Sequence, residues 1–552
     1  MGKRSRKKTG TPVTVRTAFP KETEAILEKA TLLRVALIVL AGFLIYWPAL
    51  DGGWIWDDHL LITNNPLMAD PYGLAKIWFQ PGSLFDYFPL KVTVEWIECH
   101  LWGDQVFGYH LVTLLLHLTG ALLVWKLLAR LGLREAWIGG LIFTVHPVMV
   151  ESVAWISELK NTLSLPPLLL AMCVWINYDE HRTRRDYFLA LGLFVAAMLC
   201  KTTVVMFPVV ILLYAWWKRG RIGWKDCERT VPFFAVSLVL GLTTVWFLQH
   251  HAIANRVFPM GDAFVRLARA GLSIAFYFSK CLWPVGLMPI YPQWKIDPPS
   301  LIQFLPWPVL LALFYWFWRN RQSWGRHALL GVGFFLINLA PFAGFIAGSY
   351  MDFTWVMDHL LYLPIIGLIG LAVAGWERAN GMWPLVFRPY AAAAGLAVLV
   401  LLGWGSRVYA GIFIDEETFW TYALERNPDA WPAHNNLGSI MGQQSRPAEA
   451  LAHFQEVILL NPGYAEAHNN LANALGQTGR VPEAIEEYKT AIRLDPHYLL
   501  AHSNLGYTYA QAGHPVEAIA EYEEVLKLNP ENANARQQLA QLRRLPASPA
   551  AR

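Results

Sequence analysis

Two adjacent carboxylates, Asp57 and Asp58, lie in the segment DGGWIWDDHLLITNNP, directly after the first long apolar run of the chain. Neighbouring carboxylates repel each other and are unequally solvated, so their pKa values can differ. The member that stays ionised could take a proton from a hydroxyl group during a transfer reaction. The alternative is a hydrated loop that is simply acidic. The pattern therefore predicts either a general base at Asp57 or Asp58, or a loop without chemistry.

A third carboxylate, Glu151, occurs within a largely apolar segment, HPVMVESVAWISELKN (146–161). An ionisable group at membrane depth is costly, which makes it a candidate functional residue. In the structural alternative, Glu151 pairs with Lys160 or with His146.

A lysine and a second group of polar side chains follow later in the chain. Lys201, in LCKTTVVMFP, comes directly after another apolar run. Beside a lipid phosphate its ammonium would neutralise a leaving group, whereas otherwise it would extend to the membrane surface. The segment DFTWVMDHLLYLP (352–364) supplies Asp358, His359 and Tyr362. For Asp358 the alternative is a helix start, where the helix dipole favours a carboxylate.

Membrane helices must position these groups. Of the 552 residues, 55% are hydrophobic and only 16% are charged, against roughly 25% charged in soluble domains. Runs long enough to approach the roughly 20 residues of a membrane span are expected near 32–50, 106–128, 136–150, 162–178, 188–200, 204–217, 230–248, 302–318, 328–347, 360–376 and 390–407. The segment 264–288 is expected to be re-entrant or interfacial, because it carries Arg266, Arg269 and Lys280.

Loop charges predict the orientation of these spans. Alternate connections are rich in Lys and Arg, whereas 348–359 contains neither. Because cytoplasmic loops carry the positive excess, the basic segment 1–31 is expected inside and the C-terminus outside the cytoplasm. The acidic residues described above then share the outer side with the long connection 51–105, which predicts one external cavity.

The C-terminal part has a different composition and a repeat. From Gly411 onward there are 10 Lys and Arg against 17 Asp and Glu, whereas the first 410 residues hold 35 against 24. Asn-Pro or Asp-Pro pairs recur every 34 residues, at 427, 461, 495 and 529, together with AHNNLG, AHNNLA and AHSNLG. The pattern resembles the tetratricopeptide repeat (TPR), a pair of antiparallel helices. It predicts a solenoid over 411–552, with three full repeats and a capping helix, that binds a partner on its concave face.

Three asparagines recur with the same period, Asn436, Asn470 and Asn504. A column of amides could pair with an extended peptide without reading its sequence. Alternatively, the three side chains bond to the neighbouring repeats.

The motifs that are missing restrict the chemistry. The five cysteines are scattered and show no metal-ligand spacing. There is no P-loop, no glycine-rich dinucleotide motif and no zinc-protease motif. Neither a dedicated metal site nor a nucleic-acid partner is expected, although carboxylates and a phosphate leave room for a shared divalent ion.

Several segments together resemble a known family. These are the DGGWIWDD loop, HPVMVESVAW, Lys201, KCLWPVGLMPIYP (280–292) and DHLLYLP, followed by the repeats. This order is similar to that of the TMTC (transmembrane and TPR-containing) O-mannosyltransferases and their bacterial relatives, in the GT-C glycosyltransferase superfamily. The likeness covers roughly residues 30–545. It implies an all-α protein, with a GT-C-like bundle over 32–410 and a TPR solenoid.

The resemblance also implies an activity. The family transfers a sugar, here expected to be mannose, from a polyprenyl-phosphate donor to a hydroxyl acceptor such as protein Ser or Thr. By analogy Asp57 is expected to be the base, and Glu151 to organise the acceptor or sugar. Lys201, with Lys280 or His359, would hold the phosphate, and the repeats would present the acceptor. His146, Lys160, Asp358 and Tyr362 would support this site.

The sequence departs from the family pattern at two places. Lys201-Thr202 stands where a Lys-Glu pair is expected in the eukaryotic proteins, and Leu159-Lys160 where some bacterial relatives have Arg-Lys. These differences concern donor identity more than reaction class. The variants favour a bacterial inner membrane, with the repeats on the periplasmic or extracellular side. The competing hypotheses are a non-enzymatic membrane scaffold for envelope or pilus assembly, and a transporter, for which no internal symmetry is visible.

Overall fold

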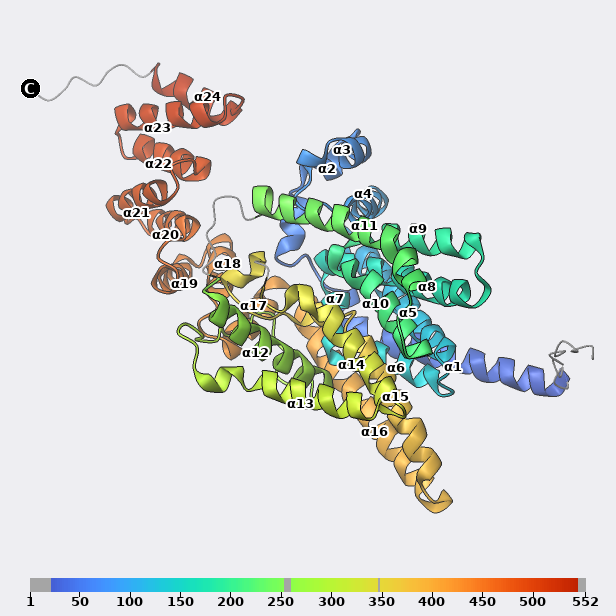
Figure 1. Cartoon of the computed structure of the whole chain (residues 1–552). Coiled ribbons are helices and arrows are strands. Elements are labelled where there is room, and N and C mark those ends of the chain that lie inside the picture. Colours follow the sequence, from blue (N-terminus) through green and yellow to red (C-terminus); the bar gives the residue numbers. More distant parts are fainter. Residues whose placement is uncertain (1–20, 253–259, 346–347, 545–552) are drawn as a thin grey trace, which may run out of the picture.

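The computed structural model describes residues 21–252, 260–345 and 348–544, and all regular elements within these residues are helical. The predicted all-α architecture, a membrane helix bundle followed by a TPR solenoid, is therefore confirmed (Figure 1). The first helices are α1 (Lys21–Leu50), α2 (Pro66–Ala69), α3 (Gly73–Phe79), α4 (Pro89–Trp102), α5 (Val106–Arg130), α6 (Ala136–Val145), α7 (Val150–Ala154), α8 (Leu159–His181), α9 (Arg184–Cys200), α10 (Phe207–Arg219) and α11 (Trp224–Phe247). The bundle continues with α12 (Ala263–Leu282), α13 (Pro306–Arg319), α14 (Gly325–Leu339), α15 (Ile365–Met382) and α16 (Arg388–Ala410).

Seven helices in the described part are long and apolar enough to cross a membrane. They are Glu28–Leu50, Val106–Arg130, Ile156–His181, Trp224–His250, Leu301–Arg319, Gly325–Phe342 and Leu385–Ile414. The pair Ala136–Val145 and Pro147–Ala154, bent by 59°, makes an eighth if it counts as one span. The protein is thus a multi-pass membrane protein.

The number of such spans is smaller than the eleven expected from the sequence. Helices occupy the other three positions, but α9 has 17 residues and α10 has 13, fewer than the roughly 20 that a perpendicular span needs. The third, α15, has 18 residues and includes Glu377 and Arg378. Among the described helices, α12 is not one of those long and apolar enough to cross a membrane, and the re-entrant or interfacial placement of 264–288 stays a prediction.

The break between α6 and α8 brings polar residues into the bundle. His146 is extended because the residue before a proline disfavours helical backbone, and α6 therefore ends at Val145. Two short 3-10 turns, Pro147–Met149 and Ile156–Glu158, flank α7 before α8 begins. The side chains of Glu151 and Glu158 are both buried in this irregular stretch.

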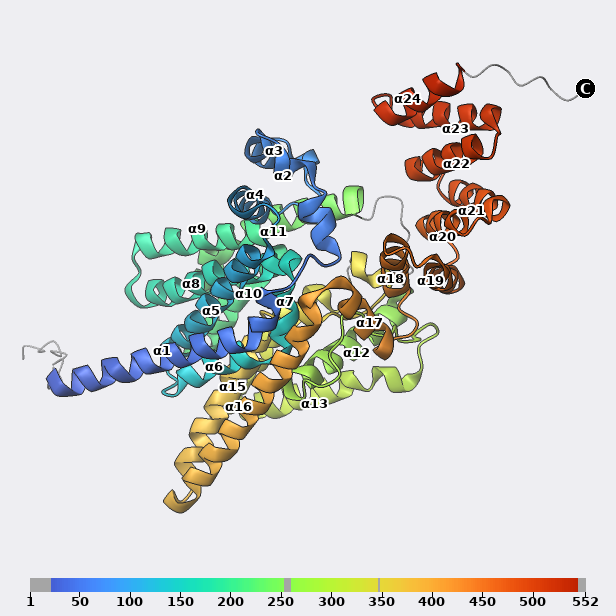
Figure 2. The same ribbon diagram turned by 180° about the vertical axis from the view of Figure 1, so that it is seen from behind.

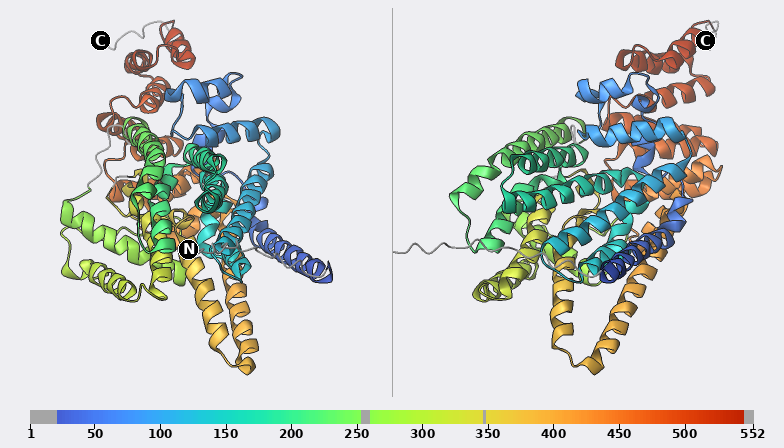
Figure 3. Two further views of the ribbon diagram at one scale, coloured as in Figure 1. Left: turned by 45° about the vertical axis from the view of Figure 1, so that its right-hand side comes forward. Right: turned by 90° about the vertical axis from the view of Figure 1, so that its right-hand side faces the viewer.

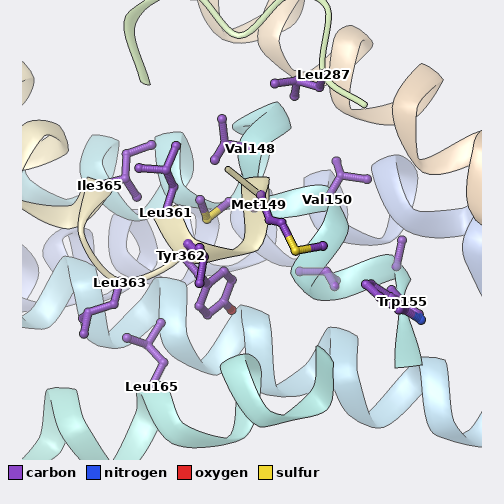
Figure 4. Packing of buried hydrophobic residues seen from close by; sticks show 14 of the residues in the cluster. Val148, Met149, Val150, Trp155, Leu165, Leu287, Leu361, Tyr362, Leu363 and Ile365 are labelled. Atoms are coloured by element: carbon purple, nitrogen blue, oxygen red, sulfur yellow. The ribbon is translucent and has the colours of Figure 1, made fainter. Parts of the chain in front are cut away.

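Apolar packing holds the irregular stretch against a second one. Figure 4 shows Val148 and Met149 beside Leu361 and Tyr362, which precede α15, with Val150 and Trp155 in the same buried cluster. Two segments about 200 residues apart in sequence are thereby fixed against each other.

The solenoid begins with α17 and continues as stacked helix pairs. Its helices are α17 (Glu416–Arg426), α18 (Trp431–Gln443), α19 (Pro447–Leu460), α20 (Ala465–Gln477), α21 (Val481–Leu494), α22 (Leu499–Gln511), α23 (Pro515–Leu528) and α24 (Ala533–Leu542). In Figure 2 the pairs stack away from the bundle, with α17 and α18 nearest to it. The hydrophobic core is continuous across this junction, through Phe413, Phe419 and Trp420.

Candidate active site

The two adjacent aspartates have different surroundings. The side chain of Asp58 is buried and accepts hydrogen bonds from the backbone N–H groups of Ile55 (2.9 Å) and Ser157 (2.8 Å), and from the Ser157 hydroxyl. Asp57 is partly exposed, and within the described residues its carboxylate has no hydrogen-bond partner. Asp58 therefore ties the outer loop to the start of η4 (Ile156–Glu158), whereas Asp57 is free to meet a substrate.

Burial also changes the protonation of both aspartates. It raises the pKa of Asp57 to about 6, against the lowering effect of the Lys160 charge. It raises the pKa of Asp58 to about 7, although the hydrogen bonds from Ser157 and Ile55 favour the ionised form. The two values lie close together, so access rather than acidity distinguishes the two residues.

Glu151 pairs with neither of the partners that the sequence suggested. Its Oε1 lies 2.8 Å from Nδ1 of His359, and its Oε2 accepts the backbone N–H of His359 at 3.1 Å. His146 instead accepts the N–H of Val148 at Nδ1 and lies 3.1 Å from the carbonyl oxygen of Cys281 at Nε2. Glu151 thus orients His359, and His146 caps a 3-10 turn.

Lys160 and Lys201 share one carboxylate, that of Glu158. Nζ of Lys160 lies 2.8 Å from Oε1 of Glu158, and Nζ of Lys201 lies 3.3 Å from Oε2. Asn161 accepts a 2.7 Å hydrogen bond from Lys201 and donates to Glu158. Nε2 of His359 lies 3.9 Å from Oε1 of Glu158, which joins this group to Glu151. Because the charges of Lys160 and Glu158 also act on the pKa of Asp57, the predicted base lies in the same region as these two residues.

Two predicted residues lie at the edge of this network. Asp358 is buried and accepts hydrogen bonds from the hydroxyls of Tyr291 (2.8 Å) and Tyr409 (3.4 Å). The hydroxyl of Tyr362 lies 2.9 Å from Nδ1 of His117. Both residues connect the segment before α15 to other helices.

Lys280 lies apart from the two other lysines. Its ammonium donates to the carbonyl oxygens of Val285 (2.6 Å) and Gly286 (3.2 Å) and lies over the rings of Phe276 and Tyr291. It therefore closes the turn that follows α12.

Some of the asparagine side chains in the repeats form hydrogen bonds between neighbouring repeats. Asn470 donates to Oδ1 of Asn435 at 3.2 Å, and Asn504 donates to Oδ1 of Asn469 at 3.0 Å. Asn436 donates back to the carbonyl of Pro432 within its own helix. A hollow beside this row is lined by Gly438, Asn470 and Asn473, among others.

Sequence reasoning missed Glu158, Asn161 and Ser157, which are all buried and polar. The sequence could have indicated them, because all three are polar residues within the same apolar segment as Glu151. The heptad spacing of Glu151 and Glu158 would have placed them on one face of a regular helix, but the chain is broken here into α7 and a 3-10 turn.

The arrangement offers acid–base chemistry beside a cluster of cations. In the part of the chain that the structure describes, no three His, Cys, Asp or Glu side chains are grouped so that they could hold a metal ion. What is present is an unpaired carboxylate whose protonation responds to the charge of Lys160, and Lys160 shares Glu158 with Lys201. This arrangement suits proton removal combined with stabilisation of an anionic leaving group.

Comparison with known families gives a consistent result. Residues 89–248 match the family described as dolichyl-phosphate-mannose-protein mannosyltransferase. Residues 417–465, 453–486, 473–513 and 499–532 match tetratricopeptide-repeat families, which confirms the predicted repeats.

Similar proteins extend this result over more of the chain. Protein O-mannosyl-transferase Tmtc3 of Drosophila melanogaster is 22% identical, over 77% of this chain and 55% of its own length. Protein O-mannosyl-transferase TMTC1 of Homo sapiens is 23% identical, over 78% of this chain and 55% of its own. The chain therefore spans about half the length of these curated relatives.

Among solved structures, MamA is 24% identical with a TM-score of 0.22, covering 22% of this chain and 72% of that chain. The first TPR of Spaghetti (RPAP3), solved with an HSP90 peptide, is 23% identical with a TM-score of 0.20, covering 20% of this chain and 92% of that chain. The chain is therefore similar to the TMTC O-mannosyl-transferases in its membrane part and carries tetratricopeptide repeats, the combination that the sequence predicted.

Proposed function

We propose that the protein is a glycosyltransferase that moves a sugar from a polyprenyl-phosphate donor to an acceptor hydroxyl. The observation that carries this proposal is the unpaired carboxylate of Asp57 beside the Lys160–Glu158–Lys201 group. The similarity to protein O-mannosyl-transferases supports mannose as the sugar and a protein Ser or Thr as the acceptor.

Each group has a role in an inverting displacement. The acceptor oxygen attacks the anomeric carbon while Asp57 takes the hydroxyl proton. The bond from the anomeric carbon to the phosphate oxygen breaks, and the polyprenyl phosphate leaves with the electron pair. Lys160 and Lys201 stabilise the charge of the departing phosphate. Glu151 holds His359 beside these lysines, where His359 can contact the phosphate or the sugar.

The test is transfer of mannose from polyprenyl-phosphate mannose to a Ser/Thr peptide by the purified full-length protein. Asp57→Asn keeps the size of the side chain and removes its basicity, so activity should fall by about 10²- to 10⁴-fold. Asp70→Asn is the matched control, because Asp70 lies in the same outer loop and pairs with Lys76. Full activity of Asp57→Asn would exclude Asp57 as the base.

An apolar cavity in the bundle is of a kind that could accommodate the lipid chain of the donor. A cavity of about 130 Å³ lies between α5, α8, α10, α14 and α15 and is lined by Leu128, Trp175, Phe207, Phe334 and Ala374, among others. A smaller pocket, whose lining includes the polar residues Asn161, Thr203 and His359, lies beside the lysine group. Residues of α14 line both, Phe334 the cavity and Asn338 the pocket. We propose that the first isoprene units of the donor lie along a path between the two.

A larger side chain in the cavity should weaken the binding of long-chain donors and leave that of short-chain donors unchanged. Ala374→Phe should raise KM for a long-chain donor by about tenfold, the effect of about 1.4 kcal/mol of lost binding, and leave a ten-carbon donor unaffected. Ala372→Phe, two residues away on the exposed face of α15, is the control. Equal effects on both donors would contradict this path.

The proposed location is a bacterial inner membrane, with the repeats on the periplasmic or extracellular side. The distribution of Lys and Arg among the loops supports this orientation. We further propose that the concave face of the repeats holds the acceptor polypeptide. The side-chain oxygens of Asn436 and Asn504 can accept from its backbone, whereas that of Asn470 already accepts from Asn469 at 3.2 Å.

A further inference from the structure

The first helix of the repeat domain reaches the loop that carries Asp57. Glu416, at the start of α17, accepts the backbone N–H of Trp56 at 2.8 Å through Oε1. The carbonyl oxygen of Ile414, just before α17, accepts the N–H of Gly53 at 2.8 Å. These bonds join segments about 360 residues apart.

Trp56 has an unusual backbone conformation, with a φ of +51°. A bulky residue rarely adopts the left-handed region, because its Cβ crowds the backbone. Such a conformation is unfavourable for a tryptophan and persists only where the surroundings enforce it. Because Asp57 follows directly, the turn at Trp56 sets the direction in which the Asp57 carboxylate points.

Aromatic packing holds the same turn from two sides. The ring of Trp56 stacks on Trp155 at 5.3 Å with an interplanar angle of 9°, and it meets the edge of Trp420 of α17 at 4.9 Å. Trp155 in turn donates to the carbonyl oxygen of Ile55 at 3.2 Å. The turn is therefore held between the bundle and α17, and among the described residues the Trp56 N–H finds its partner on α17.

The other end of α17 reaches a second part of the site. Tyr422 donates to the carbonyl oxygen of Leu287 at 3.0 Å, and Asn427, just after α17, donates to that of Ile290 at 3.2 Å. The next residue, Tyr291, holds Asp358. A movement of α17 would therefore displace both the turn at Trp56 and the segment that contains Tyr291.

We infer that Glu416 is a positioning residue for Asp57, and that α17 couples the repeat domain to the chemical step. The inference rests on the proposed function only in taking Asp57 as the base. The repeats then have a second task besides holding an acceptor, because the base is correctly placed only while α17 is docked.

The experiment compares three variants of the full-length protein in detergent or liposomes. Glu416→Ala removes the acceptor of the Trp56 N–H, whereas Glu416→Gln keeps an oxygen there and removes the charge. Glu417→Ala is the matched control, because Glu417 contacts Gln444 and Arg446 inside the repeats. Thermal unfolding of each variant shows whether it is folded.

Two readouts decide the outcome. Amide exchange of the peptide around Trp56 should be faster in Glu416→Ala and unchanged in the other two variants. The kcat for mannosyl transfer should fall about 10- to 100-fold in Glu416→Ala, since small misplacement of a catalytic group has effects of this size. KM for the lipid donor should stay within about twofold, and Glu416→Gln should retain most of the kcat.

The inference is overturned if Glu416→Ala exchanges and turns over like the wild type, or if Glu416→Gln loses as much kcat as Glu416→Ala. An inactive wild-type protein would instead count against the proposed function, and the exchange data would still decide whether Glu416 holds the turn.

Discussion

The central group of charges consists of two lysines that share one carboxylate. Lys160 and Lys201 would repel each other, and Glu158 allows both to be close by meeting one ammonium with each of its oxygens. Removing one partner from such a buried group is strongly destabilising, by about 3–5 kcal/mol, because it leaves an uncompensated charge. An incoming phosphate can compete for the same ammonium groups, and Lys160 is the more exposed of the two, with 17% of its side chain accessible.

The protonation of Asp57 gives a prediction at the scale of one residue. Burial raises its pKa to about 6, so the protonated, inactive carboxyl persists to a higher pH than for an ordinary aspartate. Activity should be present above pH 6 and fall as the pH drops through that value, by about tenfold for each further unit. The measurement is kcat/KM against pH for transfer to a fixed acceptor peptide.

The same pH profile distinguishes protonation of Asp57 from other causes of lost activity at low pH. An acid limb near pH 4, the ordinary range for aspartate, would show that the buried environment of Asp57 does not govern catalysis. Thermal unfolding at each pH serves as the control, since loss of structure would lower the melting temperature together with the rate.

Among the elements, α14 and α15 pack unusually closely. A Cβ on Gly367 would lie 2.3 Å from the carbonyl oxygen of Gly331, and a Cβ on Gly331 would lie 2.6 Å from that of Gly367. Small residues let membrane helices approach in this way. Both glycines line the apolar cavity proposed for the donor chain, so the spacing of the two helices also shapes that cavity.

Substitution of single glycines on α15 tests this packing. Gly367→Ala should lower the free energy of unfolding by about 1–3 kcal/mol, because backbone cannot yield as a side chain can. Gly375→Ala, on the same helix with nothing within 4 Å of the added atom, should be neutral or stabilise by up to about 1 kcal/mol. Thermal denaturation in one detergent measures both, and similar effects at the two positions would contradict the close approach.

The elements were largely predictable from sequence, whereas their contacts were not. The 34-residue period and the apolar runs are local patterns, and the repeats and most spans follow from them. The partner of Glu151 lies 208 residues away at His359, and no local pattern indicates that pairing. The left-handed turn at Trp56 was equally hidden, because tryptophan has no preference for such a conformation. The candidate residues were therefore recognised by type, and their roles depend on tertiary structure.

At the scale of the whole molecule, the bundle and the solenoid share one hydrophobic core. Phe413, Phe419 and Trp420 connect it from α16 to the repeats, and Glu416 adds a polar link to the outer loop. Figure 3 shows the tip of the α15–α16 hairpin at the end of the molecule away from the repeats.

The side of the membrane on which the repeats lie can be tested with reporter fusions. An alkaline phosphatase fused after the last repeat should be active, because it folds only outside the cytoplasm, and a green fluorescent protein at the same site should be dark. Insertion of the same reporters at Trp383, in the short connection between α15 and α16, should give the opposite pair of results. Fluorescence from the C-terminal fusion would place the repeats in the cytoplasm. In that case the repeats and the outer loop would have to lie on the cytoplasmic side together, since Glu416 binds that loop directly, and the donor would have to be used there.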